Sequence, residues 1–285
     1  NCRLCVECIS KVKSFIKEKA NIYLIGCGRM GGSILAAWIK RGYPLKNIFV
    51  EELNPSEWLR SKSIEGLNLN YHQPPDIQYC FLAVKPQSLE TIRPILKYLS
   101  NKSVTFVSML AGIEIKRIGE YVGTKEAITR IMPNLPAQVF KGVTALIENE
   151  FVKKEKLIEL TSLLESFGAV IKLSGEDKID VVTAISGSGP AYIFLMAELM
   201  INEGIRQGLT VEESNVLAKN TILGAGELMI DSDLTPGKLR ENVTSPGGTT
   251  QAALLHLMNE KKGLPPILSN AINAAIQRSK QLSKI

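Results

Sequence analysis

Short apolar runs alternate with helical patterns along the first 174 residues of the chain. The run Asn21–Ile25 ends in a glycine and predicts a buried strand, and residues 31–40 predict a helix that stops at Gly42. Further strands are expected at 48–50, 79–84, 104–107 and 127–131, with helical patterns between them. Alternation of this kind predicts an α/β domain with a mostly parallel sheet that carries helices on both faces.

The pattern changes near residue 175, where strand-like runs stop. Helical spacing follows at 191–207, 211–230, 249–260 and 266–282. We therefore divide the chain into a leader or tail (1–20), an α/β domain (21–174) and an all-α domain (175–285).

Composition and charge narrow the class of protein. With 285 residues, 45% hydrophobic and 22% charged, the chain is long enough for two globular domains. The net charge of +6 comes from the two ends, because residues 1–19 hold five basic against two acidic residues and the last eight hold three basic residues. We expect no nucleic-acid partner, because this charge does not form an interior groove. No apolar run reaches the roughly 18 residues of a membrane span, so no membrane partner is expected either.

Cysteine usage suggests a reduced compartment. Cys2, Cys5 and Cys8 have the spacing C-x2-C-x2-C, which is typical of the start of an iron–sulfur or zinc site. A fourth ligand at suitable spacing is missing, and the chain has only two histidines, His72 and His256. We expect no metal, free thiols and a cytoplasmic location. The leader also lacks the apolar segment of a secretory signal.

The segment Gly26-Cys27-Gly28-Arg29-Met30-Gly31 fits G-x-G-x-x-G between a predicted strand and a predicted helix. In that context Gly26 permits a tight turn, Gly28 lets the backbone approach a pyrophosphate, and Gly31 lets helix and strand pack closely. The helix N-terminus offers free N–H groups to phosphates. The alternative is a plain glycine-rich turn. We expect dinucleotide binding.

Four polar residues lie just past predicted strand ends, where open parallel sheets bind their ligands: Glu51, Lys85, Ser108 and Asn134. Taken singly, each residue could have an ordinary structural role, such as Glu51 as a surface charge or Ser108 as a cap. Their shared position favours a common crevice, and Lys85 is held extended by Pro86.

Two motifs rich in small residues interrupt the helical domain. The first motif is SGSGPAY at 186–192, in which Pro190 suits the first turn of a helix. This motif is equally compatible with close helix packing between subunits and with ligand binding. The second, 242–254 (NVTSPGGTTQAAL), places glycines and hydroxyls directly before a helix. Such backbone amides form a receptor for a carboxylate or a phosphate.

Hydrolytic machinery is missing from the sequence. Neither H-E-x-x-H nor G-x-S-x-G is present, and no histidine falls in a predicted site. Hydride delivery to an activated C=N bond fits better, because it needs no strong protein acid or base.

These motifs together resemble the pyrroline-5-carboxylate reductase family. The matching pieces are GCGRMG at 26–31, FLAVKPQ at 81–87, VSMLAG at 107–112, MPNLP at 132–136, SGSGPAY at 186–192 and NVTSPGGTTQAAL at 242–254. The resemblance spans residues 21–283. It implies reduction of 1-pyrroline-5-carboxylate to L-proline, the last step of proline biosynthesis, with NADPH or NADH. It also implies a Rossmann-type N-terminal domain and an all-α C-terminal dimerisation domain, in a homodimer that assembles further into decamers in some members.

The resemblance also implies roles for individual residues. Thr250 would hydrogen-bond the substrate's ring nitrogen as the catalytic residue. The other expected substrate ligands are Ser245, Gly247, Gly248, Thr249, Lys85 and Asp233. The expected cofactor ligands are Gly26, Gly28, Arg29, Met30, Gly31, Glu51, Ala83, Lys85, Pro86, Ser108, Ala111 and Asn134.

Three departures from the family pattern bear on these roles. Leu135 replaces a threonine and Asp233 a glutamate, and Glu51-Glu52 stand where serine or arginine is common. Glu51 follows Gly31 by about twenty residues, the spacing of an acid that accepts hydrogen bonds from a free ribose 2′-OH. We therefore expect NADH to be used at least as well as NADPH. The alternative is that both glutamates face solvent while Asn54 and Ser56 meet a 2′-phosphate.

Two other functions stay open at this stage. A dehydrogenase of the β-hydroxyacid type would carry a catalytic lysine on a central helix, but residues 195–207 contain none. A dinucleotide-sensing protein without turnover is the third possibility. Loss of nicotinamide absorbance on addition of pyrroline-5-carboxylate discriminates all three.

Overall fold

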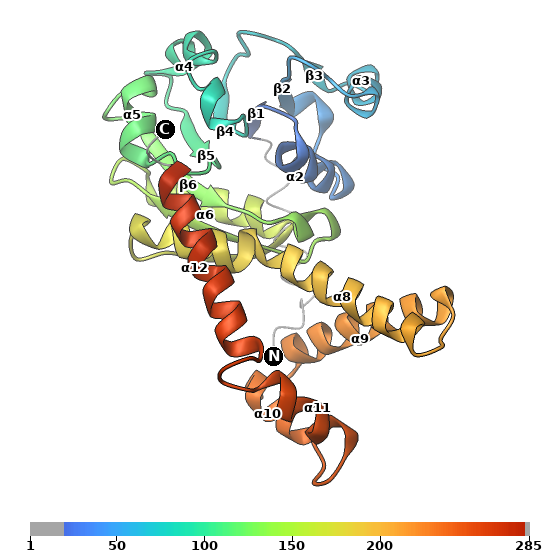
Figure 1. Cartoon of the computed structure of the whole chain (residues 1–285). Coiled ribbons are helices and arrows are strands. Elements are labelled where there is room, and N and C mark those ends of the chain that lie inside the picture. Colours follow the sequence, from blue (N-terminus) through green and yellow to red (C-terminus); the bar gives the residue numbers. More distant parts are fainter. Residues whose placement is uncertain (1–19, 283–285) are drawn as a thin grey trace. The chain divides into compact units, whose positions relative to one another are not determined.

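The computed structural model describes residues 20–282 (Figure 1). The described chain forms two compact units, of which the second is Ser188–Ala275 and the first holds the remainder. Residues 1–19 lie outside the described residues. They include Cys2, Cys5 and Cys8 and all but the last residue of the predicted leader, 1–20.

The first unit is built on a mixed sheet whose spatial order is β3-β2-β1-β4-β5-β6-β7-β8. All neighbouring strands are parallel except β6 and β7, which pair antiparallel. The chain order reverses between β1 and β4, and such a switch point is where doubly wound sheets bind their ligands. The strands are β1 (Asn21–Ile25), β2 (Ile48–Glu51), β3 (Asn68–Leu69), β4 (Ile77–Leu82), β5 (Thr105–Ser108), β6 (Ala127–Met132), β7 (Gly142–Glu148) and β8 (Gly168–Lys172).

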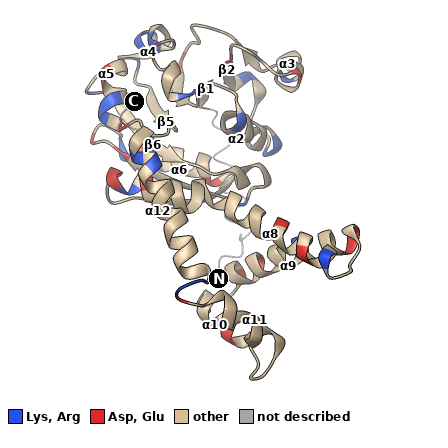
Figure 2. Ribbon diagram, viewed as in Figure 1, with Lys and Arg blue, Asp and Glu red and all other residues tan. Residues whose placement is uncertain are grey.

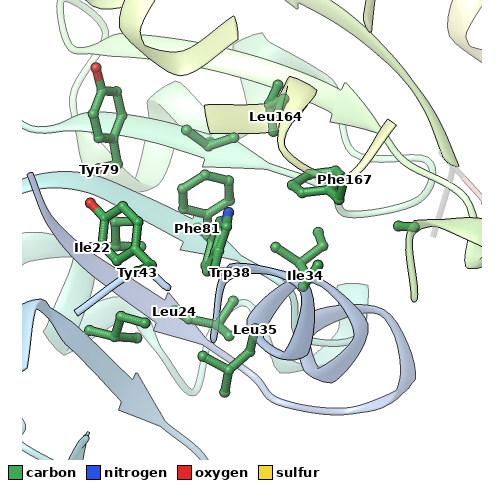
Figure 3. Close-up of a cluster of buried hydrophobic side chains, with 14 of the residues drawn as sticks. Ile22, Leu24, Ile34, Leu35, Trp38, Tyr43, Tyr79, Phe81, Leu164 and Phe167 are labelled. Atoms are coloured by element: carbon green, nitrogen blue, oxygen red, sulfur yellow. The ribbon is translucent and has the colours of Figure 1, made fainter. Parts of the chain in front are cut away.

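Helices cover both faces of this sheet, because side chains alternate along each strand. Ile22 and Leu24 of β1 pack with α2 and α6 on one face, and Tyr23 and Ile25 pack with α4 and α5 on the other. Figure 3 shows the first of these cores, where the Trp38 ring meets the Phe81 ring edge-on at 4.9 Å between centroids. The helices of this region are α2 (Arg29–Lys40), α3 (Glu57–Ile64), α4 (Arg93–Leu99), α5 (Ile115–Val122) and α6 (Lys154–Glu165), with short 3₁₀ turns η1 (Leu45–Asn47), η2 (Pro86–Ser88) and η3 (Leu135–Val139).

The sequence predictions for this region hold for the strands named, within two residues at each end. They are wrong in two respects. Helix α2 begins at Arg29, two residues before the expected start, because Gly28 has the extended backbone of an N-cap. The strands β3, β7 and β8 were not expected, since short apolar runs do not distinguish a strand from a buried helix and β3 has only two residues.

The chain then turns helical, as the sequence predicts. The elements are η4 (Glu176–Lys178), α7 (Ile179–Val182), the π-helical turn η5 (Thr183–Gly187), α8 (Gly189–Arg206), α9 (Val211–Asp231), α10 (Pro236–Asn242), α11 (Thr249–Leu257) and α12 (Leu264–Leu282). A carbon added at Gly204 would lie 2.8 Å from Ser214 Oγ, so α8 and α9 approach closely at the tip of their hairpin. Ala218 is the one hydrophobic residue of Ser188–Ala275 in the buried core.

The second unit instead exposes its apolar side chains. Phe194 is 59% exposed, Leu223 59% and Leu255 73%. Figure 2 shows that the first half of α8 and the whole of α11 hold no Lys, Arg, Asp or Glu. A single copy of this unit therefore leaves its hydrophobic faces uncovered.

Candidate functional site

The glycine-rich loop after β1 is held between its two neighbouring strands. Gly26 N donates to Glu51 O (2.8 Å), and Ala83 N donates to Ile25 O (2.8 Å), which continues the sheet ladder past the strand ends. Gly26 has φ +94°, a conformation that side chains rarely adopt, and a carbon added there would lie 2.8 Å from the Ala83 carbonyl. The tight turn at this position therefore requires glycine.

The other two glycines of the loop differ in their surroundings. A carbon added at Gly31 would lie 2.2 Å from Gly26 O, so the start of α2 packs directly on the turn. At Gly28 no atom lies within 4 Å of such a carbon. Gly28 is the N-cap of α2 without a side-chain cap, and the first turn holds no acid. The amides of this turn have no intrahelical acceptor, and the open surface at Gly28 suits a pyrophosphate.

Other predicted cofactor ligands lie at or past the ends of β4 and β5, and of these Ala83 contacts Gly26 and Gly31 of the loop. Lys85 has the extended backbone (φ −69°, ψ 147°) that Pro86 imposes, and its side chain is exposed. Ala83 and Ala111 are half-buried, while Ser108 at the end of β5 is fully buried and accepts a hydrogen bond from Leu110 N (3.4 Å).

Asn134 has its side-chain amide engaged within the first unit. Its Oδ1 accepts from Val143 N (2.9 Å), and its Nδ2 donates to Ser186 O (3.1 Å). The residue thus ties the loop after β6 to β7 and to the start of the SGSGPAY motif. The neighbouring Leu135, where the family pattern has threonine, is half-buried at the start of η3.

The side chains of Glu51 and Glu52, at the end of β2, point in different directions, and the Glu51 carboxylate turns away from the loop although its backbone oxygen accepts from Gly26 N. Glu51 Oε2 accepts from the Tyr23 hydroxyl (3.0 Å), and Oε1 lies 3.0 Å from His72 Nδ1. Its side chain is only 11% exposed. Tyr23 belongs to the α4–α5 face of the sheet, opposite to α2.

Glu52, which the sequence prediction did not select, faces the loop instead. Its Oε2 accepts from Cys27 N (2.6 Å) and its Oε1 from Asn54 N (3.0 Å). Burial, together with the Glu52 charge, raises the pKa of the Cys27 thiol to about 12. The only sequence signal for Glu52 is its place one residue past the strand end.

The second motif forms a tight turn before α11. Gly248 N donates to Ser245 O (3.0 Å), and Gly247 has φ +70°. A proline at the second position and a positive-φ glycine at the third are typical of a type II turn, which explains Pro246-Gly247. A carbon added at Gly248 would lie 2.5 Å from Ser245 Oγ, so a side chain at this position would force the Ser245 hydroxyl to move.

Gln251, missed by the sequence prediction, fixes this turn from the helix. Its Oε1 accepts from Gly247 N (2.6 Å). The amides of Gly247 and Gly248 therefore donate within the turn. The amides of the first turn of α11, which begins at Thr249, have no intrahelical acceptor. Thr249 is exposed and Thr250 half-buried, and Asp233 is exposed between α9 and α10. Gly248 caps the helix without a side chain, as Gly28 does for α2.

The first small-residue motif straddles a π-helical turn. Ser186 Oγ donates to Val182 O (3.0 Å), and Pro190 lies in the first turn of α8 as predicted. A carbon added at Gly189 would meet nothing within 4 Å. The motif thus leaves backbone exposed at the start of α8.

Within residues 20–282 no group of three or more His, Cys, Asp or Glu side chains is placed to hold a metal ion. The helical stretch Glu176–Arg206 has the length and apolar composition of a membrane span, although serines and glycines interrupt it.

Comparison with known proteins gives a consistent result. Residues 176–282 match the family model described as pyrroline-5-carboxylate reductase dimerisation. A pyrroline-5-carboxylate reductase of Pseudomonas aeruginosa is 33% identical over 268 residues, which cover 92% of this chain and 97% of that protein.

Solved structures agree. The pyrroline-5-carboxylate reductase of Coxiella burnetii is similar with a TM-score of 0.85 and 33% identity, covering 94% of this chain and all of that one. A Plasmodium falciparum pyrroline carboxylate reductase with NADP bound has a TM-score of 0.81 at 28% identity, covering 93% of this chain and 99% of that one. With its sheet order, its glycine-rich loop and its S-P-G-G turn, this chain belongs to the pyrroline-5-carboxylate reductase family.

Proposed function

We propose that this protein reduces 1-pyrroline-5-carboxylate to L-proline with NADPH or NADH, the last step of proline biosynthesis. The observation that carries the proposal is that two helices in a chain of this family, α2 and α11, begin after an N-cap glycine and have no side-chain cap. One follows β1 and suits a pyrophosphate, and the other follows the S-P-G-G turn and suits a carboxylate. A cytoplasmic location stays a prediction.

The chemistry of the residues around the glycine-rich loop supports dinucleotide binding. The open surface at Gly28 and the amides of Arg29, Met30 and Gly31 would hold the pyrophosphate. Ala83, Lys85 and Pro86, with Ser108 and Ala111, would border the nicotinamide. When bound, the reduced nicotinamide supplies the hydride. Asn134 contributes by holding its own loop and the start of the next motif in place.

The substrate residues act by orientation. The amides of the first turn of α11 and the Ser245 hydroxyl would bind the carboxylate, and the Thr250 hydroxyl would hydrogen-bond the ring nitrogen. Hydride adds to the carbon of the C=N bond, the π electron pair moves to nitrogen, and nitrogen takes its proton from water. A threonine is too weak an acid to supply that proton, so its role is to place the carbon about 3–3.5 Å from the hydride donor. Lys85 and Asp233 stay predicted substrate ligands.

The exposed apolar faces of the second unit lead us to propose a homodimer. Phe194, Leu223 and Leu255 lie within residues 176–282, which match the dimerisation model. A second copy covers such faces better than a membrane does, because Glu198, Glu203 and Arg206 interrupt α8. We expect more than about 2,000 Å² to be buried, as in obligate dimers. An active monomer in sedimentation at micromolar concentration contradicts this proposal; assembly into decamers stays a prediction.

The reaction is tested with the purified full chain. Reduced-nicotinamide absorbance should fall when 1-pyrroline-5-carboxylate is added, with stoichiometric formation of L-proline. Turnover of a β-hydroxyacid but not of the imino acid contradicts the proposal. So does tight dinucleotide binding with no turnover of either substrate, which indicates a sensing protein.

A further inference from the structure

The carboxylate of Glu52 contacts the glycine-rich loop. Its two oxygens accept N–H groups from Cys27 within the loop (2.6 Å) and from Asn54 beyond it (3.0 Å). Its own N–H donates to Asn70 Oδ1 (2.9 Å), so backbone and side chain are both fixed. Glu52 is half-buried, which limits solvent screening of its charge.

Glu51 does not share this position, although it is the nearer match by spacing. Tyr23 and His72 engage its two oxygens on the other face of the sheet. Consecutive side chains of an extended segment point to opposite faces, so the two carboxylates diverge. Of the two, only Glu52 reaches the loop.

The segment after β2 offers no compensating cation. Residues 52–56 read Glu-Leu-Asn-Pro-Ser, and the Leu53 side chain is 81% exposed. Arg29 is exposed at the start of α2, and the Arg60 side chain is directed to the backbone, because its Nε donates to Pro55 O (3.2 Å). A 2′-phosphate on the adenosine ribose would therefore meet a fixed carboxylate, whereas a free 2′-OH would find an acceptor.

We infer that Glu52 is the specificity-determining residue for the cofactor and directs this protein to NADH over NADPH. The inference rests on the proposed function, because it presumes that the loop binds a dinucleotide. A carboxylate repels a phosphate at contact range by an amount that corresponds to about tenfold in Kd.

The test is titration calorimetry of the full chain with NADH and with NADPH, in wild type, Glu52→Gln and Glu51→Gln. We expect NADH to bind more tightly than NADPH in wild type. Glu52→Gln should shift the ratio of the two Kd values about tenfold towards NADPH. Glu51→Gln removes the same charge one residue away and should leave the ratio within about twofold of wild type. High salt should reduce the wild-type discrimination, because it screens the repulsion but spares a purely structural role.

Three results overturn different parts of the argument. Tighter NADPH binding in wild type that Glu52→Gln does not change refutes the role of Glu52, and points to Arg29 or Arg60 as a phosphate ligand. An equal shift in Glu51→Gln also refutes it. Failure of both dinucleotides to bind refutes the proposed function itself.

Discussion

Three alanine substitutions within five residues of the glycine-rich loop should have three different effects. Gly28→Ala places a methyl group in open space, Gly31→Ala places one 2.2 Å from Gly26 O, and Gly32→Ala places one at an ordinary 3.5 Å from Cys27 O. The chemical change is the same in each, so the surroundings alone decide the outcome.

The magnitudes follow from these contacts. Gly31→Ala requires a shift of more than 1 Å between α2 and the turn, because ordinary contact begins near 3.4 Å. Such overpacking costs about 1–3 kcal/mol of unfolding free energy, or roughly 3–10 °C in Tm. Gly28 has φ −69°, which alanine adopts freely, so Gly28→Ala should keep or slightly raise stability. Its methyl group would displace the pyrophosphate and lose at least one charge-assisted hydrogen bond, about 10- to 100-fold in Kd.

Thermal unfolding followed by tryptophan fluorescence and titration with NADH measure the two quantities separately. Gly32→Ala is the matched control and should gain up to about 1 kcal/mol, as alanine does within a helix, with unchanged Kd. Wild-type affinity in Gly28→Ala refutes the close approach of a pyrophosphate to this backbone. Wild-type Tm in Gly31→Ala refutes the packing of α2 on the turn.

Further predictions concern the substrate turn, a buried ion pair and a thiol. Thr250→Ala should lower kcat/KM by about 1–3 kcal/mol of transition-state stabilisation, and unchanged kinetics removes this hydroxyl from the mechanism. Glu176→Ala should cost about 3–5 kcal/mol in urea unfolding, because it removes the partner, 2.8 Å away, of the buried Arg130 guanidinium; a loss below about 1 kcal/mol contradicts this. The raised pKa of Cys27, about 12, makes its neutral form the stable one at pH 7. Peptide mapping should therefore find iodoacetamide labelling of Cys27 on the order of a thousandfold slower than that of an ordinary thiol and rising with pH; rapid labelling at pH 7 contradicts this.

The sequence by itself determined the features that depend on neighbouring residues. The strand Asn21–Ile25, the extended backbone at Lys85 and the place of Pro190 in the first turn of α8 follow from local sterics and periodicity. The left-handed conformation of Gly26 belongs to the same group. The order of six motifs then sufficed to indicate the family.

Other features depend on what lies across space. The strands β7 and β8 exist because β7 pairs antiparallel with β6 and β8 pairs with β7, and short apolar runs do not encode those partners. The same holds for Asn134, whose side chain donates to Ser186 O, 52 residues further along the chain.

The choice between Glu51 and Glu52 at the end of β2 is the clearest case that the sequence alone did not decide. Counting residues from the glycine-rich loop locates the strand end to within one position, and that one position separates Glu51 from Glu52. Because side chains alternate along a strand, a difference of one residue moves a carboxylate to the other face of the sheet. Only the tertiary structure, which pairs Glu51 with Tyr23 and Glu52 with the Cys27 amide, decides which of the two charges faces the cofactor loop.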